Sequence, residues 1–181
     1  MKEVLDKEQQ TYTLKIARGA IKYYLETNQQ LKVEPEYDIL KEKRGAFVTL
    51  KTKGQLRGCI GYPLPYKPLI TTLIDCAISA STRDYRFQPL SLDELNDTTI
   101  EISVLTLPKT IQDINEIVIG EHGIIISKGH QKGLLLPQVP VEWNWDLETY
   151  LRHGCIKAGL DEDEWKHNAT IEIFSAQVFS E

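Results

Sequence analysis

Two apolar segments on either side of a Lys-Gly pair constrain the fold of this chain more than any other feature. In "GAFVTLKTKGQLRGCIG" (residues 45–61), the first segment runs to Leu50 and the second starts at Leu56. Lys53-Gly54 between them predicts a tight turn, because glycine readily adopts the positive φ that short hairpin turns need. A hairpin pairs its strands antiparallel, so the chain is predicted to contain an antiparallel sheet.

Glycine, proline or capping residues separate the remaining segments. Apolar alternation predicts half-buried strands, and three apolar runs between glycine-containing turns predict a meander. The strand segments are "TIEISVL" (99–105) and "NATIEIFSAQVF" (168–179), and the meander is 117–137. Helical spacing or capping predicts helices over about 4–28, after Pro68, after Ser91, and from Asp146 to about Ala158. This order favours an α+β fold with a largely antiparallel sheet flanked by helices.

Composition narrows the class of protein. The chain has 181 residues, which predicts a single domain over 1–181, and its formal net charge of −5 disfavours broad neutralisation of a nucleic acid backbone. Its apolar runs fall short of the about 20 residues that span a bilayer, and its first residues are too polar for a signal peptide. Cys59, Cys76 and Cys155 are widely spaced, which is typical of reduced thiols in a cytoplasmic protein.

Cys59 lies between two glycines in the second strand of the hairpin. Alternation along a strand would place Arg57, Cys59 and Gly61 on one face, and Leu56 and Ile60 on the other, in the core. A cation near a thiol favours the thiolate, so we predict that Arg57 activates Cys59 as a nucleophile and binds an anionic substrate group.

The glycines around Cys59 have two interpretations. Gly58 and Gly61 would leave room for a substrate beside the thiol. Alternatively, they mark a bulge or close packing, and Cys59 is a small buried residue without reactivity.

Five further residues are candidates for the same site. Asp84 and His122 would handle protons, while Arg86, Gln138 and Lys157 would bind the substrate. Four of them also have a structural interpretation. Asp84 and Arg86 would be part of a charge cluster that ties down a helix end, and His122 would be an exposed turn residue. Lys157 would snorkel or satisfy the C-terminus of its helix. The four histidines and three cysteines lack metal-ligand spacing, so no metal site is predicted, and no motif identifies a cofactor.

A resemblance follows from an ordered series of motifs. "LRGCIG", preceded by "GAFVTL", is similar to the signature hexapeptide of the AMMECR domain family, whose prokaryotic members are called AmmeMemoRadiSam system protein A. "RFQPLS", "IEISVL", "GEHGIII", "LLPQV", "WNWD" and "KAGL" continue the likeness in order from about residue 15 to 179. Matching positions are Leu56 to Gly61, Asp84, Arg86, Phe87, Pro89, Gly123, Pro137, Gln138, Trp145, Lys157 and Gly159. Ser81, Thr82 and Pro140 depart from the family pattern.

The resemblance implies two subdomains with a cleft between them, and places the LRGCIG strand near that cleft. It implies a pathway shared with a Memo-like protein and a radical S-adenosylmethionine enzyme, but it supplies no reaction. Two functions stay open. The first is a small-molecule enzyme or enzyme subunit that uses a cleft around Arg57 and Cys59. The second is a module that binds a ligand or a partner protein without catalysis.

Overall fold

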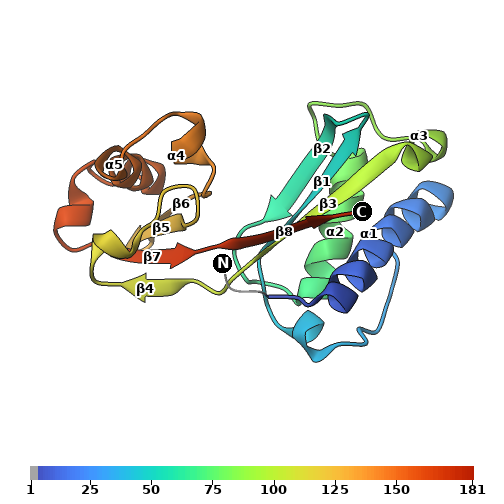
Figure 1. Ribbon diagram of the computed structural model, residues 1–181, viewed down its shortest axis with the longest axis horizontal. Coiled ribbons are helices and arrows are strands. Elements are labelled where there is room, and N and C mark those ends of the chain that lie inside the picture. The colour runs from blue at the N-terminus through green and yellow to red at the C-terminus, as the bar shows by residue number, and fades with distance from the viewer. Residues whose placement is uncertain (1–3) are drawn as a thin grey trace. The chain divides into compact units, whose positions relative to one another are not determined.

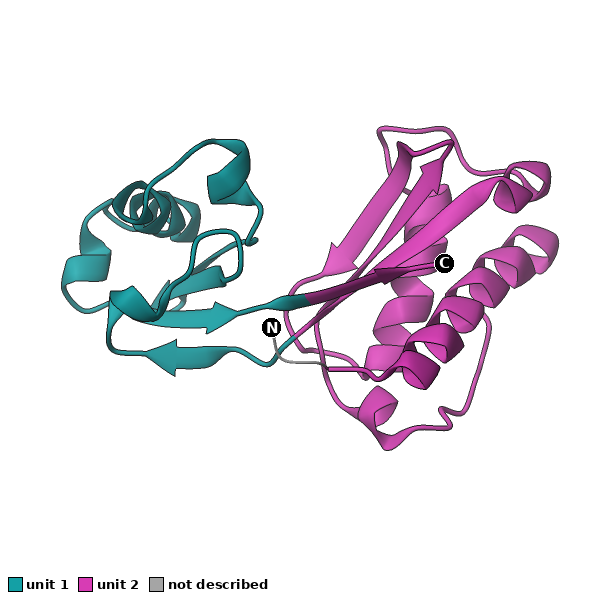
Figure 2. Cartoon of the chain, viewed as in Figure 1, with its two compact units in different colours: residues 1–2, 106–176 teal, residues 3–105, 177–181 magenta. Residues whose placement is uncertain are grey.

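A computed structural model describes residues 4–181 as two compact units (Figure 2). Unit 1 comprises Thr106–Ala176, and unit 2 comprises 4–105 together with Gln177–Glu181. Within the described residues there are five α-helices and two four-stranded sheets, which confirms the predicted α+β class.

The sheet of unit 2 has the strand order β2-β1-β3-β8. Its strands are β1 (Ala46–Thr52), β2 (Gln55–Tyr62), β3 (Thr98–Leu105) and β8 (Ala176–Ser180). β1 pairs antiparallel with both β2 and β3. The predicted hairpin turn is confirmed, because Lys53 and Gly54 both have positive φ, 52° and 77°.

Helices cover one face of this sheet. α1 (Lys7–Thr27) begins at a capping box on Asp6, and α3 (Leu92–Asn96) begins at the predicted capping box on Ser91. α2 (Leu69–Thr82) follows Pro68, as predicted, and packs against β1, β2 and α1. Figure 1 shows α1 and α2 side by side against the sheet. A 3₁₀ helix, η1 (Asp38–Lys41), also contacts α2.

The core of unit 2 lies between this face and the helices. Alternate residues of β1 and β3 are buried there, together with one side of α1 and nearly all of α2. The strand residues are Ala46, Val48, Leu50, Ile100, Ile102 and Val104. We call this the inner face of the sheet, and the opposite face the outer face.

Unit 1 has its own sheet and its own core. The strand order is β4-β7-β5-β6, from β4 (Lys109–Ile111), β5 (Gly123–Lys128), β6 (Gln131–Leu135) and β7 (Thr170–Phe174). α5 (Leu147–Ala158) starts at the predicted cap on Asp146 and packs on β5 and β6. α4 (Val139–Glu142), η2 (Ile114–Glu116) and η3 (Glu164–Lys166) are short.

Two predicted elements were wrong. The meander has two strands, because the run at Ile117–Ile119 forms a turn in which the Val118 carbonyl accepts from the amides of Glu121 and His122. The C-terminal strand is two strands in different sheets. The chain changes partner at Ser175, whose backbone bonds to Thr106, and β8 then joins the sheet of unit 2.

No helix formed by residues 4–181 is both long enough and apolar enough to cross a membrane.

Candidate functional site

A β-bulge at Arg57 determines which side chains surround Cys59. Leu50 pairs with Gly58, but Lys51 pairs with Leu56, so Arg57 is the extra residue. The bulge puts Leu56 on the outer face with Lys51, and Leu56 is 43% exposed. The prediction that Leu56 lies in the core was therefore wrong, because strict alternation ends at the bulge.

Cys59 belongs to a polar row on the outer face. It pairs across the hairpin with Thr49, and Thr49 pairs with Glu101 on β3. The Thr49 hydroxyl donates to the Cys59 Sγ over 3.2 Å, and Lys51 Nζ lies 2.8 Å from a Glu101 carboxylate oxygen. The half-buried thiol therefore shares a face with a hydroxyl, a carboxylate and an ammonium group.

Asp84 and Arg86 bind the backbone of Cys59 at the edge strand β2. The Cys59 amide donates to Asp84 Oδ2 over 2.9 Å, and Arg86 Nη2 donates to the Cys59 carbonyl over 3.3 Å. The guanidinium also pairs with both Asp84 oxygens, at 2.9 and 2.7 Å. This ion pair satisfies the backbone groups that a further strand would otherwise bind.

The ion pair changes the protonation behaviour of both partners. Hydrogen bonds from Arg86, with a further one from the Cys59 amide, hold the pKa of the buried Asp84 carboxyl well below its usual range. Asp84 in turn raises the pKa of Arg86. Asp84 is therefore an anion at neutral pH and holds the strand around Cys59 in place.

Arg57 is bound to a different carboxylate. Its guanidinium lies 3.3 Å from Glu94, and Nη1 donates to the Gln88 carbonyl over 2.8 Å. Backbone hydrogen bonding at Ser91 and the pairing with Arg57 lower the pKa of Glu94. These contacts tie the bulge to α3 and to the loop before it, whereas Arg86 is the guanidinium bonded to the backbone of Cys59.

The glycines beside Cys59 allow close packing. A Cβ on Gly58 would lie 2.1 Å from the Ala80 carbonyl oxygen of α2, and one on Gly61 would lie 2.1 Å from the Phe47 ring. The space next to both glycines is thus filled by the protein itself. For these positions the structure supports close packing, the second of the two interpretations.

Three predicted site residues lie on separate elements of unit 1. His122 precedes β5, and its Nδ1 accepts from the Val118 amide over 3.1 Å. Gln138 is the exposed N-cap of α4, and Lys157 is exposed in the last turn of α5. The carbonyl of His122 lies 3.2 Å from the hydroxyl of the buried Tyr150, which also contacts the carbonyl of Leu135.

The other two thiols differ from Cys59 in burial. Cys76 and Cys155 are fully buried, in the cores of units 2 and 1. Burial raises the pKa of Cys76 to about 12, and also raises the pKa of Cys155. Across residues 4–181 no group of three or more His, Cys, Asp or Glu side chains is arranged to hold a metal ion.

Thr49, Lys51 and Glu101 were not predicted as site residues. Alternation in 99–105 does put Glu101 on the polar side of its strand. A regular hairpin with its turn at Lys53-Gly54, however, would pair Thr49 with Gly58. The bulge shifts this register by one residue, so that Thr49 pairs with Cys59.

Comparisons with known proteins agree with this fold. The chain is 46% identical over 191 residues to protein MK0488 of Methanopyrus kandleri, covering 100% of this chain and 92% of that protein. It is 44% identical over 187 residues to protein MJ0810 of Methanocaldococcus jannaschii, covering 98% and 92%. The crystal structure of uncharacterised protein PH0010 from Pyrococcus horikoshii is similar, with a TM-score of 0.79, 39% identity, and coverage of 99% of this chain and 94% of that chain. The AMMECR1 family model matches residues 14–179, so the chain belongs to the AMMECR1 family.

Proposed function

We propose that the protein binds a small metabolite on the outer face of the unit 2 sheet, around Cys59, and acts on it as an enzyme or enzyme subunit. One observation carries this proposal. Cys59 is partly exposed, and it lies in a row with Thr49 and Glu101. A buried thiol such as that of Cys76 packs in the core, whereas a thiol among polar groups can take part in a reaction.

The residues of the outer face would have separate roles. Cys59 would act as nucleophile or acid–base group, with Thr49 orienting its sulfur. Glu101 would handle a proton, and its pairing with Lys51 at 2.8 Å holds the carboxylate on the outer face. Arg86, whose side chain is 44% exposed, would bind an anionic group of the substrate. We assign Asp84 and Arg57 to positioning, because their contacts hold β2 and the neighbouring loop.

We further propose that both units form one functional domain, since a single family model spans residues 14–179. His122, Gln138 and Lys157 are the candidates for a contribution from unit 1. The resemblance to the AmmeMemoRadiSam system supports a cytoplasmic pathway with a Memo-like protein and a radical S-adenosylmethionine enzyme.

Protection of Cys59 from alkylation tests the proposed binding. Iodoacetamide labelling is followed by mass spectrometry with and without fractions of a small-metabolite extract. We expect one fraction to slow labelling of Cys59 in the wild type, and to have less effect in Thr49→Val and Glu101→Gln. An extract in which no fraction protects Cys59 contradicts the proposal. Complementation with Cys59→Ser and Cys59→Ala separates catalysis from binding, because full activity in both removes the thiol from the reaction.

A partner-binding module without catalysis is the second candidate. Tyr66, in the proline-rich loop after β2, is 71% exposed, and Tyr85, beside the Asp84–Arg86 pair, is 95% exposed. Exposed aromatic side chains are enriched in protein interfaces. Sedimentation with the Memo-like protein and the radical enzyme tests this function. A complex that Tyr66→Ala and Tyr85→Ala weaken would favour it, and sedimentation as separate species at micromolar concentration would contradict it.

A further inference from the structure

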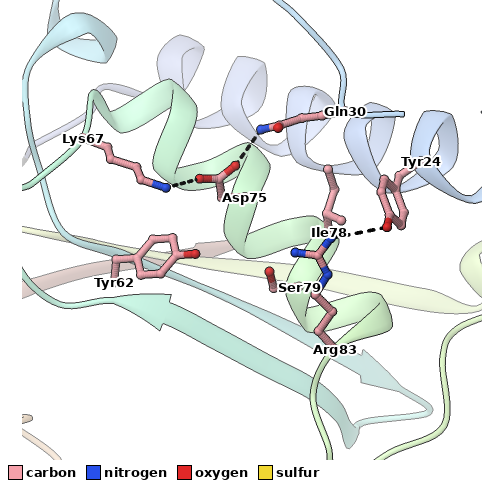
Figure 3. A pocket seen from close by; sticks show the side chains of 8 residues that line it. All are labelled: Tyr24, Gln30, Tyr62, Lys67, Asp75, Ile78, Ser79 and Arg83. Carbon is pink, nitrogen blue, oxygen red and sulfur yellow. Dashed lines mark hydrogen bonds and ion pairs between the residues drawn. The ribbon is translucent and has the colours of Figure 1, made fainter. Parts of the chain in front are cut away.

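A pocket in unit 2 lies on the helix side of the sheet, whereas Cys59 lies on the outer face. Its volume is about 250 Å³, close to the lower end of the range of roughly 300–1,000 Å³ for small-molecule sites. Figure 3 shows the lining side chains, which come from α1 and the segment after it, the end of β2, the loop between β2 and α2, and α2 with its C-cap. They are Tyr24, Gln30, Tyr62, Lys67, Asp75, Ile78, Ser79 and Arg83.

One lysine and one carboxylate in the pocket neutralise each other. Lys67 Nζ lies 2.6 Å from Asp75 Oδ2, and Gln30 Nε2 donates to Asp75 Oδ1 over 2.6 Å (Figure 3). Both carboxylate oxygens are therefore occupied. Lys67 also lies 4.9 Å from the centre of the Tyr62 ring, which orients that ring at the pocket wall.

Arg83 supplies a positive charge that no carboxylate in residues 4–181 balances. Its Nη2 donates to the Tyr24 hydroxyl over 3.4 Å, and its guanidinium carbon lies 5.9 Å from the centre of the Tyr24 ring. The pocket thus carries one net positive charge in a chain whose formal net charge is −5. Most of the guanidinium donors remain available, and their planar geometry suits a carboxylate or phosphate.

Ser79 adds a hydroxyl with an unused hydrogen bond. Asp75 and Ser79 lie four residues apart on one side of α2, and Arg83, the C-cap of α2, lines the same pocket. The neighbouring Ser81 and Thr82 hydroxyls donate to the Ile78 carbonyl, but within the described chain the Ser79 hydroxyl has no partner. Ser79 is 9% exposed, and its hydroxyl is not one of the buried side-chain atoms that lack a partner, so it is open to the pocket, where a ligand can reach it.

We propose that this pocket binds a small aromatic anion. Arg83 and Ser79 hold its phosphate or carboxylate group, and its ring contacts Tyr24, Tyr62 and Ile78. Both kinds of ligand carry an oxyanion on a single aromatic ring, and a molecule of that size fits the volume of the pocket. This site does not depend on Cys59, so its failure and the failure of the proposed function are separate results.

Three probes test the site in the full chain: phenyl phosphate, benzoate and inorganic phosphate. Each is titrated into ¹⁵N-labelled protein, and amide shifts give the location and the affinity. We expect saturable shifts around Ser79 and Tyr62 with an aromatic probe. Arg83→Gln should weaken binding by about tenfold or more, and Ser79→Ala by about threefold or more. Lys15→Gln is the matched control, because it removes an exposed charge on α1 that does not line the pocket.

The outcomes separate the alternatives. Tighter binding of phenyl phosphate assigns the group as phosphate, tighter binding of benzoate assigns it as carboxylate, and either supports the proposal. Inorganic phosphate that binds as tightly as both aromatic probes contradicts the aromatic part. Shifts confined to other residues, the absence of saturation at millimolar probe, or equal weakening by Lys15→Gln would overturn the site. The wild-type shift map keeps the test decisive even where a variant fails to fold.

Discussion

On the inner face of the unit 2 sheet, Val48 of β1 and Ile102 of β3 are fully buried. The neighbouring residues in the two strands, Thr49 and Glu101, place polar groups on the outer face. The same two strands therefore serve two purposes. Inner-face side chains hold the helices by apolar burial, and outer-face side chains surround a thiol. Substitutions on the inner side should change stability, and substitutions on the outer side should change the reactivity of Cys59.

Gly58→Ala should have the largest effect on stability. The new Cβ would meet the Ala80 backbone at 2.1 Å, so β2 and α2 must move apart, which should lower the free energy of unfolding by about 3 kcal/mol or more. Denaturant unfolding measures this. Gly19→Ala is the control, because its Cβ would meet only a side chain at 3.9 Å and a helical alanine is favoured. Equal stability of Gly58→Ala and wild type would show that α2 does not pack on β2 as described.

Asp84→Asn should have the next largest effect on stability, and the size of this effect should depend on pH. Because the folded pKa of Asp84 is lowered, its stabilising contribution is complete above the unfolded pKa of about 3.9 and declines as the pH falls below it. We expect a loss of about 2 kcal/mol at pH 7, a modest value because Arg86 is partly exposed to solvent. The difference from wild type should shrink below about pH 4. A difference that grows on acidification would contradict this assignment.

Thr49→Val tests the outer face with little change in stability. It removes the hydroxyl that donates to Cys59 but keeps the shape, so the free energy of unfolding should change by less than about 1 kcal/mol. The iodoacetamide rate of Cys59 should nevertheless change by about twofold or more, because the sulfur loses its donor. Thr99→Val, on the same face and paired with Lys51, is the control and should leave that rate unaltered. Identical rates in Thr49→Val and wild type would show that the contact does not influence the thiol.

Glu101→Gln should have the smallest effect on stability, below about 0.5 kcal/mol, because its partner Lys51 is partly exposed. If Glu101 handles a proton, activity in the complementation assay should fall far more than stability does. Unchanged activity, or a loss matched by a loss of folded protein, would remove Glu101 from the proposed mechanism.

Local signals predicted the elements well and their pairing less well. Turn and capping residues such as Gly54, Ser91 and Asp146 act on their immediate neighbours, so they could be interpreted from the sequence alone. The bulge at Arg57 and the change of sheet at Ser175 depend on distant partners. Local patterns do not encode such contacts.

The candidate site shows the same limit. Cys59, Asp84 and Arg86 were predicted, and the structure brings them together through the backbone of Cys59. Which guanidinium bonds to the backbone of Cys59 was not predictable, because that depends on the bulge and on the position of α3, which brings Glu94 next to Arg57. Thr49 and Glu101 were missed because a one-residue shift in register decides which side chains share a row.

The rate of Cys59 alkylation in the native protein tests the central claim most directly. Iodoacetamide labelling of all three cysteines, followed over time by mass spectrometry, uses Cys76 and Cys155 as internal controls because both are fully buried. The account predicts that Cys59 is labelled without denaturant while the other two stay unmodified. If Cys59 stays unmodified until the protein unfolds, the outer face around it is not an accessible site, and the proposed function is contradicted.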